Sequence, residues 1–137
     1  MSHYVECKPG FKDREALIEA LVAVGFDRGQ IESHQDAVAL YGYRGDERPQ
    51  RAHIVIRREH VGTAANDVGW ERLPDGSYRA WISEYDQRHR FNEALQNRIK
   101  QEYAVAALTR QARATGRTVD RRQREDGAIV LRIAGYR

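Results

Sequence analysis

Cysteine, lysine and long apolar runs are all scarce in this sequence of 137 residues. Cys7 is the only cysteine, so an intramolecular disulfide is excluded and a cysteine-based metal site would need several more ligands. No apolar run approaches the roughly 20 residues of a membrane span, and the first ten residues lack the features of a signal peptide. We therefore expect a cytoplasmic protein without membrane segments, with Cys7 as a small buried apolar residue.

The composition is that of a globular chain, with 41% hydrophobic and 31% charged residues. No repeat or low-complexity linker divides it, which predicts a single domain over residues 1–137. The charge is uneven: residues 1–86 contain 11 basic and 15 acidic residues, whereas residues 87–137 contain 12 and 5. A basic C-terminal part is typical of binding to nucleic acid or to an acidic protein surface.

The N-terminal region predicts a short strand followed by a helix. Alternation over Tyr4–Lys8 indicates the strand. Asp13 is placed to cap the helix, Gly25 to end it in a left-handed conformation, and Phe26 to fold back on it. The apolar stripe of this helix consists of Leu17, Leu21 and Val24.

Four alternating segments then predict an antiparallel meander. They are Ala37–Tyr43, His53–Glu59, the stretch around Val68 and Trp70, and Tyr78–Ile82. A long second helix is expected from Asp86 to about Gly116. The chain then closes with a hairpin from about Thr118, which turns at Asp126-Gly127 and places Ile129, Leu131 and Ile133 inward.

The order of elements is thus β-α-β-β-β-β-α-β-β. Grouped strands with few helices predict an α+β fold, an antiparallel sheet with two helices packed on one face. The other face of the sheet would remain partly open for binding.

Motifs of catalysis are missing. None of the five histidines has the helical spacing of a metalloprotease, and neither a phosphate-binding loop nor a dinucleotide fingerprint occurs. We expect no metal and no cofactor, and the sequence favours a protein without catalysis of its own.

The segment Tyr41-Gly42-Tyr43-Arg44-Gly45 has two interpretations. In the structural one it is a strand that ends in a turn, where Gly42 allows close packing and Gly45 supplies a positive φ. In the functional one, two aromatic rings and an arginine at a strand end grip a planar or anionic group. On the second interpretation the partner-binding residues are Tyr41, Tyr43, Arg44 and the outward-facing Trp81.

The densest basic residues lie in the C-terminal part. They are Arg110, Arg113, Arg117, Arg121, Arg122 and Arg124. A solvated edge strand protected from aggregation accounts for most of them. Alternatively, they form a basic patch that binds nucleic acid.

Several segments, taken in their order and spacing, carry a family resemblance. They are Met1–Tyr4, Tyr41–Gly45, Ala52–Arg57, Asn66–Trp70, Gln101–Ala104 and Glu125–Gly127. Together they resemble the uncharacterised family 1257 of domains of unknown function, which includes a hypothetical reading frame of red algal plastids and cyanobacteria. The similarity covers nearly the whole chain, which departs from plastid-type members around Val61–Ala65 and in its many arginines.

This resemblance implies an accessory or adaptor role, because members are often encoded near an AAA+ ATPase and other small proteins. The expected partner is therefore a protein, with an AAA+ ATPase as the candidate. The sequence leaves nucleic-acid binding and homo-oligomer formation open.

Overall fold

The computed structural model describes residues 4–7 and 9–135, apart from the side chains of Val5 and Cys7. The predictions for Lys8 and for the Cys7 side chain lie outside the described residues. The strands are β1 (Tyr4–Cys7), β2 (Ile31–Tyr41), β3 (Glu47–Ile56), β4 (Val68–Arg72), β5 (Tyr78–Ser83), β6 (Thr118–Gln123) and β7 (Ile129–Ala134). The helices are α1 (Arg14–Ala23), α2 (Arg58–Val61), α3 (Glu84–Gln87), α4 (Glu93–Ala114) and the 3₁₀ turn η1 (Arg28–Gln30).

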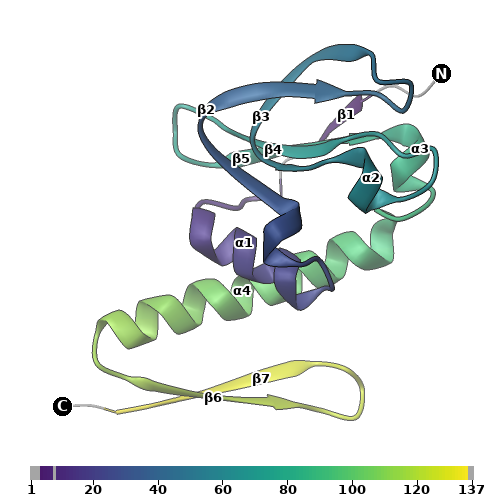
Figure 1. The fold of residues 1–137 in the computed structure, drawn as a ribbon. Coiled ribbons are helices and arrows are strands. Elements are labelled where there is room, and N and C mark those ends of the chain that lie inside the picture. Colours follow the sequence, from purple (N-terminus) through teal and green to yellow (C-terminus); the bar gives the residue numbers. More distant parts are fainter. Residues whose placement is uncertain (1–3, 8, 136–137) are drawn as a thin grey trace.

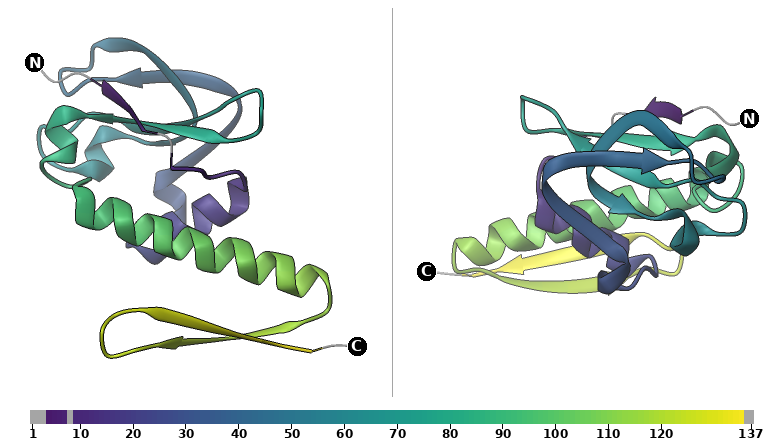
Figure 2. Two further views of the ribbon diagram at one scale, coloured as in Figure 1. Left: turned by 180° about the vertical axis from the view of Figure 1, so that it is seen from behind. Right: turned by 45° about the horizontal axis from the view of Figure 1, so that its top comes forward.

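Five strands form one antiparallel sheet in the order β1-β5-β4-β3-β2. The predicted α+β class with an antiparallel sheet is therefore confirmed. α1 and α4 pack on one face of this sheet, and β6 and β7 form a separate two-stranded sheet on the far side of α4 (Figure 1). Figure 2 shows from two further directions that α4 lies between this hairpin and the large sheet.

The main core lies between the large sheet and the two helices. Phe91 packs there between Trp70 and Phe26, with ring centres 6.1 Å and 5.7 Å away. The predicted ends of the first helix are confirmed. Asp13 accepts the backbone N–H of Ala16 at 3.2 Å, and after Gly25, at φ +119°, the Phe26 side chain is only 2% exposed.

The opposite face of the sheet is more closed than predicted. Leu40, Ala52 and Val55 are fully buried there, and Val38 and Trp81 pack against them. Register shifts in the β2–β3 pair bend it over the rest of the sheet, since bulges increase local twist. The bent hairpin thus encloses a second, smaller core.

The long helix begins later than predicted. Asn92 caps α4 by accepting the N–H of Leu95 at 2.9 Å, whereas Asp86 lies in the short helix α3 and is fully buried. The N–H of Phe91 bonds to the carbonyl of Asp86 at 2.7 Å, which turns the chain between the two helices. Asp86 is a residue type that commonly caps helices, but here its carboxylate is buried and accepts hydrogen bonds inside the protein.

The closing hairpin was predicted correctly in its strands and its turn. Ile129 and Leu131 are half-buried, whereas Ile133, predicted to face inward, is 37% exposed. Two strands resting on one helix cover less surface than a layered sheet does. In the part of the chain that the structure describes, no helix is long and apolar enough to cross a membrane.

The close packing of the second core can be tested at Gly69 in β4. A Cβ atom there would lie 2.5 Å from the Cβ of Ala52 and 3.0 Å from Cδ2 of Leu40. Gly69→Ala is therefore expected to lower the free energy of unfolding by about 1–3 kcal/mol in urea denaturation, because overpacking forces shifts. Gly29→Ala, where a Cβ meets nothing within 4 Å, is the matched control and should differ little from the parent. Equal stability of the two variants would contradict the close packing at Gly69.

Candidate binding surface on the β2–β3 hairpin

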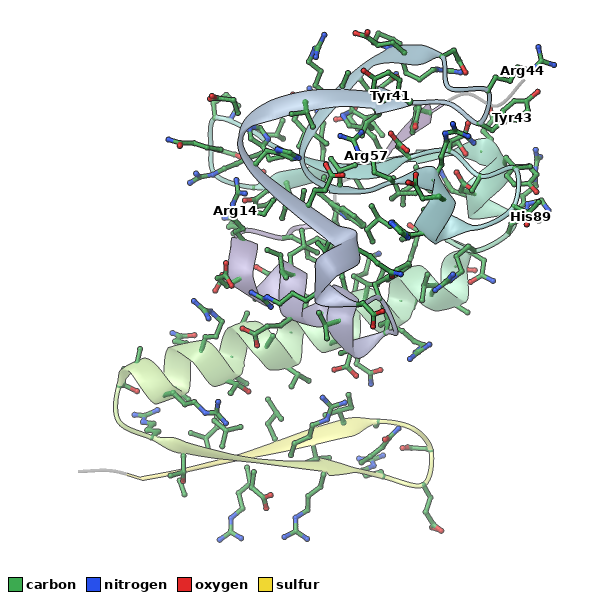
Figure 3. All side chains as sticks on the ribbon, viewed as in Figure 1. Arg14, Tyr41, Tyr43, Arg44, Arg57 and His89 are labelled. Atoms are coloured by element: carbon green, nitrogen blue, oxygen red, sulfur yellow. The ribbon has the colours of Figure 1, made fainter. Side chains whose placement is uncertain are left out.

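The tip of the β2–β3 hairpin gathers three of the four predicted partner-binding residues, Tyr41, Tyr43 and Arg44 (Figure 3). Tyr41 ends β2, and both tyrosines are 37% exposed. The structural role of the glycines is confirmed: Gly45 has φ +80°, and a Cβ on Gly42 would lie 2.6 Å from Oδ1 of Asp46. A tight turn therefore carries Tyr43 and Arg44, and Tyr41 ends the strand that leads into it.

Two arginines accompany these rings. Nε of Arg44 donates to the Tyr43 hydroxyl at 2.9 Å, and its guanidinium lies 5.3 Å from the ring centre. Arg58, at the start of α2, donates to the Tyr43 carbonyl at 3.0 Å. Neither arginine has a carboxylate partner among the described residues. We refer to Tyr41, Tyr43, Arg44 and Arg58 as the hairpin surface.

Arg57 lies beneath this surface and carries no comparable free charge. It donates to both oxygens of Glu32 at 3.0 and 3.1 Å, to Asp67 at 2.9 Å and to the Ala39 carbonyl at 3.0 Å. Burial would lower the pKa of Arg57, but its hydrogen bonds to Glu32 and Asp67 outweigh burial and raise it. Burial likewise opposes ionisation of Glu32, yet the bonds from Arg57 and His34 lower its pKa. The ion pair therefore stays charged over a wide pH range.

Asp67 fixes the main chain of the hairpin. Its side chain is 2% exposed, and its two oxygens accept the backbone N–H groups of Tyr41 at 2.8 Å and Arg58 at 2.7 Å. Its carbonyl accepts the Tyr4 hydroxyl at 2.6 Å, and burial, followed by the charge of Asp67, raises the pKa of that hydroxyl. The same carboxylate thus binds Arg57 and holds both ends of the hairpin surface.

Asn66 connects the hairpin to a buried acid. Its Oδ1 accepts the N–H of Tyr43 at 2.9 Å, while its own N–H and side-chain amide donate to Oδ2 of Asp86 at 3.1 and 3.3 Å. The Ser83 hydroxyl donates to the same oxygen at 2.7 Å. Oδ1 of Asp86 is buried and has no hydrogen-bond partner among the residues that the structure describes. Burial raises the pKa of Asp86 against these hydrogen bonds.

Sequence reasoning assigned no role to Asn66 and Asp67. The available indication was a polar pair directly before the apolar strand that contains Val68 and Trp70. Buried polar side chains are nearly always hydrogen-bonded, so such a pair suggests main-chain anchoring. The stretch around Val61–Ala65, where the sequence departs from plastid-type members, forms the end of α2 and the following loop, and both named residues are buried.

Trp81, the fourth predicted residue, lies on β5 and not in the turn between β2 and β3. Its Nε1 donates to Glu71 at 3.0 Å, and the guanidinium of Arg79 lies 5.0 Å from its ring centre. It lines a cleft together with Pro49 and Arg79 and packs on the second core. Trp81 therefore belongs to this cleft and to the second core.

The six arginines of the predicted basic patch lie on α4, β6 and the adjoining turns. At least four of them pair with nearby carboxylates: Arg110 with Asp13 and Glu19, Arg121 with Glu102, Arg122 with Asp120 and Arg124 with Asp126. Arg113 and Arg117 are exposed near the end of α4. Much of the positive charge in this region is therefore balanced locally.

Comparisons with known proteins bear on the family and not on the activity. The family model described as "Protein of unknown function (DUF1257)" matches residues 26–132. The chain belongs to this family. The DUF1257 match includes the hairpin surface, Asn66, Asp67 and Asp86. Neither the curated proteins nor the solved structures give a match. Among the described residues, no group of three or more His, Cys, Asp or Glu is arranged to hold a metal ion.

Loss of the Asp67 carboxylate should weaken the whole hairpin. Asp67→Ala would leave the half-buried Arg57 with Glu32 as its remaining carboxylate partner and two backbone N–H groups without acceptors. Leaving a largely buried donor without its acceptor costs about 1–3 kcal/mol, and because several donors lose Asp67 together we expect a loss of about 3 kcal/mol or more in the free energy of unfolding from urea denaturation. Glu47→Ala removes an exposed pair with Arg51 and should cost less than about 1 kcal/mol. Similar losses in both variants would refute the anchoring role.

Asp86 should make stability depend on pH. Its pKa in the folded protein is raised above the usual value of 3.8, so the folded state retains the proton that the unfolded state releases. This stabilising contribution is complete below about pH 4 and is lost as the pH rises through the raised pKa. Asp86→Asn removes this titrating group. When the free energy of unfolding is measured in urea at several pH values, the value of Asp86→Asn relative to that of the parent should therefore increase as the pH rises. A constant difference would show that the pKa of Asp86 is not raised.

Proposed function

We propose that this protein is a non-catalytic adaptor that binds a protein partner through the hairpin surface. The supporting observation is the combination of two exposed tyrosines with Arg44 and Arg58, which lack carboxylate partners among the described residues. Tyrosine and arginine are the residue types enriched at the energetic centres of protein interfaces. Two unbalanced guanidinium groups favour a partner segment that is acidic.

The rigid support of the surface favours binding further. Asn66 and Asp67 fix the backbone of Tyr41 and Tyr43, so little main-chain entropy is lost when a partner docks. The tyrosine rings can then pack on apolar or planar groups while the arginines pair with carboxylates. Trp81 would contribute only if the partner also reached the cleft on β5.

The candidate partner is an AAA+ ATPase, and the candidate compartment is the cytoplasm. The choice of an AAA+ ATPase rests on the family resemblance, because proteins encoded next to each other often bind each other. The choice of the cytoplasm rests on the single cysteine, which is typical of a chain that needs no oxidising environment.

A pull-down of the tagged protein from its native host, with and without nuclease and analysed by mass spectrometry, tests this proposal. A stoichiometric protein partner should survive nuclease, and Tyr43→Ala combined with Arg44→Ala should reduce its recovery at least tenfold, as expected for interface residues worth about 2 kcal/mol together. The double variant should fold normally, because Asn66 and Arg58 bind the main chain of Tyr43. Arg122→Ala, in an exposed pair with Asp120, is the control and should retain the partner.

Two results would overturn the proposal. Unchanged recovery with the double variant would remove the hairpin surface as the binding site. Recovery that collapses with nuclease and with charge-removing changes at Arg113 and Arg117 would instead support the nucleic-acid alternative.

A further inference from the structure

A second polar site lies at the other end of the β2–β3 pair, where a large bulge interrupts the sheet. Ser33 pairs with Ile54 and Val38 pairs with Ala52, so four residues of β2 face the single residue His53 of β3. Bulges of this kind expose a strand and redirect its side chains, and they are frequent next to binding sites. Here the bulge borders a cleft of about 380 Å³.

The lining of this cleft consists of cationic and amide groups with a small apolar wall. The lining residues are Arg14, Gln35, His53, Arg72, Leu73 and Pro74. They come from the first turn of α1, the bulge of β2, β3, the last residue of β4 and the turn that follows β4. Arg14, labelled in Figure 3, lies where α1 approaches the sheet. None of these lining residues is acidic.

His53 is oriented by the main chain. Its Nδ1 accepts the backbone N–H of Arg72 at 2.9 Å. Because an acceptor nitrogen carries no proton, the neutral ring has its proton on Nε2, which has no hydrogen-bond partner among the described residues. The ring thus offers one N–H donor from a fixed position.

The two arginines of the cleft differ from many others in this protein. Arg28, Arg51, Arg57 and Arg79, for example, each pair with a carboxylate. Arg14 instead donates to the Ser33 hydroxyl at 2.6 Å and the His34 carbonyl at 3.1 Å, and Arg72 has no ion pair among the described residues.

Burial lowers the pKa of His53. The charges of Arg14 and Arg72 lower this pKa further, whereas those of Glu71 and Asp36 raise it. The ring therefore lies near two positive charges that form no ion pair with any described residue.

We propose that this cleft is an anion-binding site for a small phosphate monoester. Guanidinium groups match the oxygens of a phosphate, and a histidine N–H adds a further donor. Leu73 and Pro74 supply an apolar wall for the organic part of such a molecule. The cationic groups surround one cleft and do not form a stripe along the surface, which favours a compact ligand over a nucleic-acid strand.

Titration of the full-length protein with phenyl phosphate, at an ionic strength held constant with sodium chloride, tests the site. NMR signals of the His53 ring report binding, and the other described histidines serve as internal references. A dianion beside the ring stabilises its charged form, so saturation with phenyl phosphate should raise the pKa of His53. Inorganic phosphate, titrated in parallel, should bind more weakly, since it lacks the group that contacts the apolar wall.

Arg72→Gln is the decisive variant, because Arg72 forms no ion pair with any residue that the structure describes. Its dissociation constant for phenyl phosphate should rise about tenfold, as expected for loss of a charge-assisted hydrogen bond. Arg122→Gln changes the net charge equally but lies in β6, and it should leave the constant within about twofold of the parent. A second variant, Arg14→Gln, should weaken binding in the same direction as Arg72→Gln.

Three outcomes would overturn the proposal. The first is the absence of a saturable change at His53. The second is equal weakening by Arg72→Gln and Arg122→Gln, which would show non-specific attraction only. The third is a response at His53 to a single-stranded oligonucleotide but not to phenyl phosphate, which would assign the cleft to nucleic acid.

Discussion

The ion pair between the buried Asp67 and the half-buried Arg57 is the interaction on which the rest of the hairpin depends. One carboxylate accepts a guanidinium and the backbone N–H groups of Tyr41 and Arg58, so strand, turn and short helix are fixed at a single point. A buried charge of this kind is tolerated only when its hydrogen bonds are complete. Because Glu32 completes the set around Arg57, the bend of β2 over the sheet, the second core beneath it and the orientation of the hairpin surface are mutually dependent.

The distribution of carboxylates decides which arginines can act on other molecules. In the C-terminal part, Arg110, Arg121, Arg122 and Arg124 meet carboxylates of the same chain. At the hairpin surface and in the cleft beside His53, arginines meet hydroxyls and carbonyls instead. A hydrogen bond to a neutral acceptor leaves the charge of a guanidinium uncompensated, and such charge attracts anionic groups from outside. Arginines without a carboxylate partner are thus found at the hairpin surface and in the cleft, although the C-terminal part is the most basic segment of the sequence.

Local rules predicted much of the fold. The cap at Asp13, the positive φ of Gly25 and Gly45, and the strands and turn of the last hairpin all follow from residue types and spacing over a few positions. The same rules placed Asp86 at the start of the long helix, although α4 begins only at Glu93. Asp86 instead accepts hydrogen bonds from Asn66 and Ser83, and its burial depends on the packing of α3 against the sheet. Capping preference is a local tendency, and tertiary hydrogen bonds overrode it.

The sequence by itself determined the α+β class, the antiparallel strands, the family and the presence of Tyr41, Tyr43 and Arg44 at one turn. It did so because alternation, capping and turn chemistry act between residues that are close along the chain. Only the tertiary structure decided that Trp81 donates to Glu71 and lines a cleft on β5, that Arg57 pairs with carboxylates, and that His53 faces a cleft beside Arg14 and Arg72. Those outcomes depend on strand order, bulges and ion pairs between distant residues, and no local pattern in one sequence encodes which carboxylate reaches which arginine.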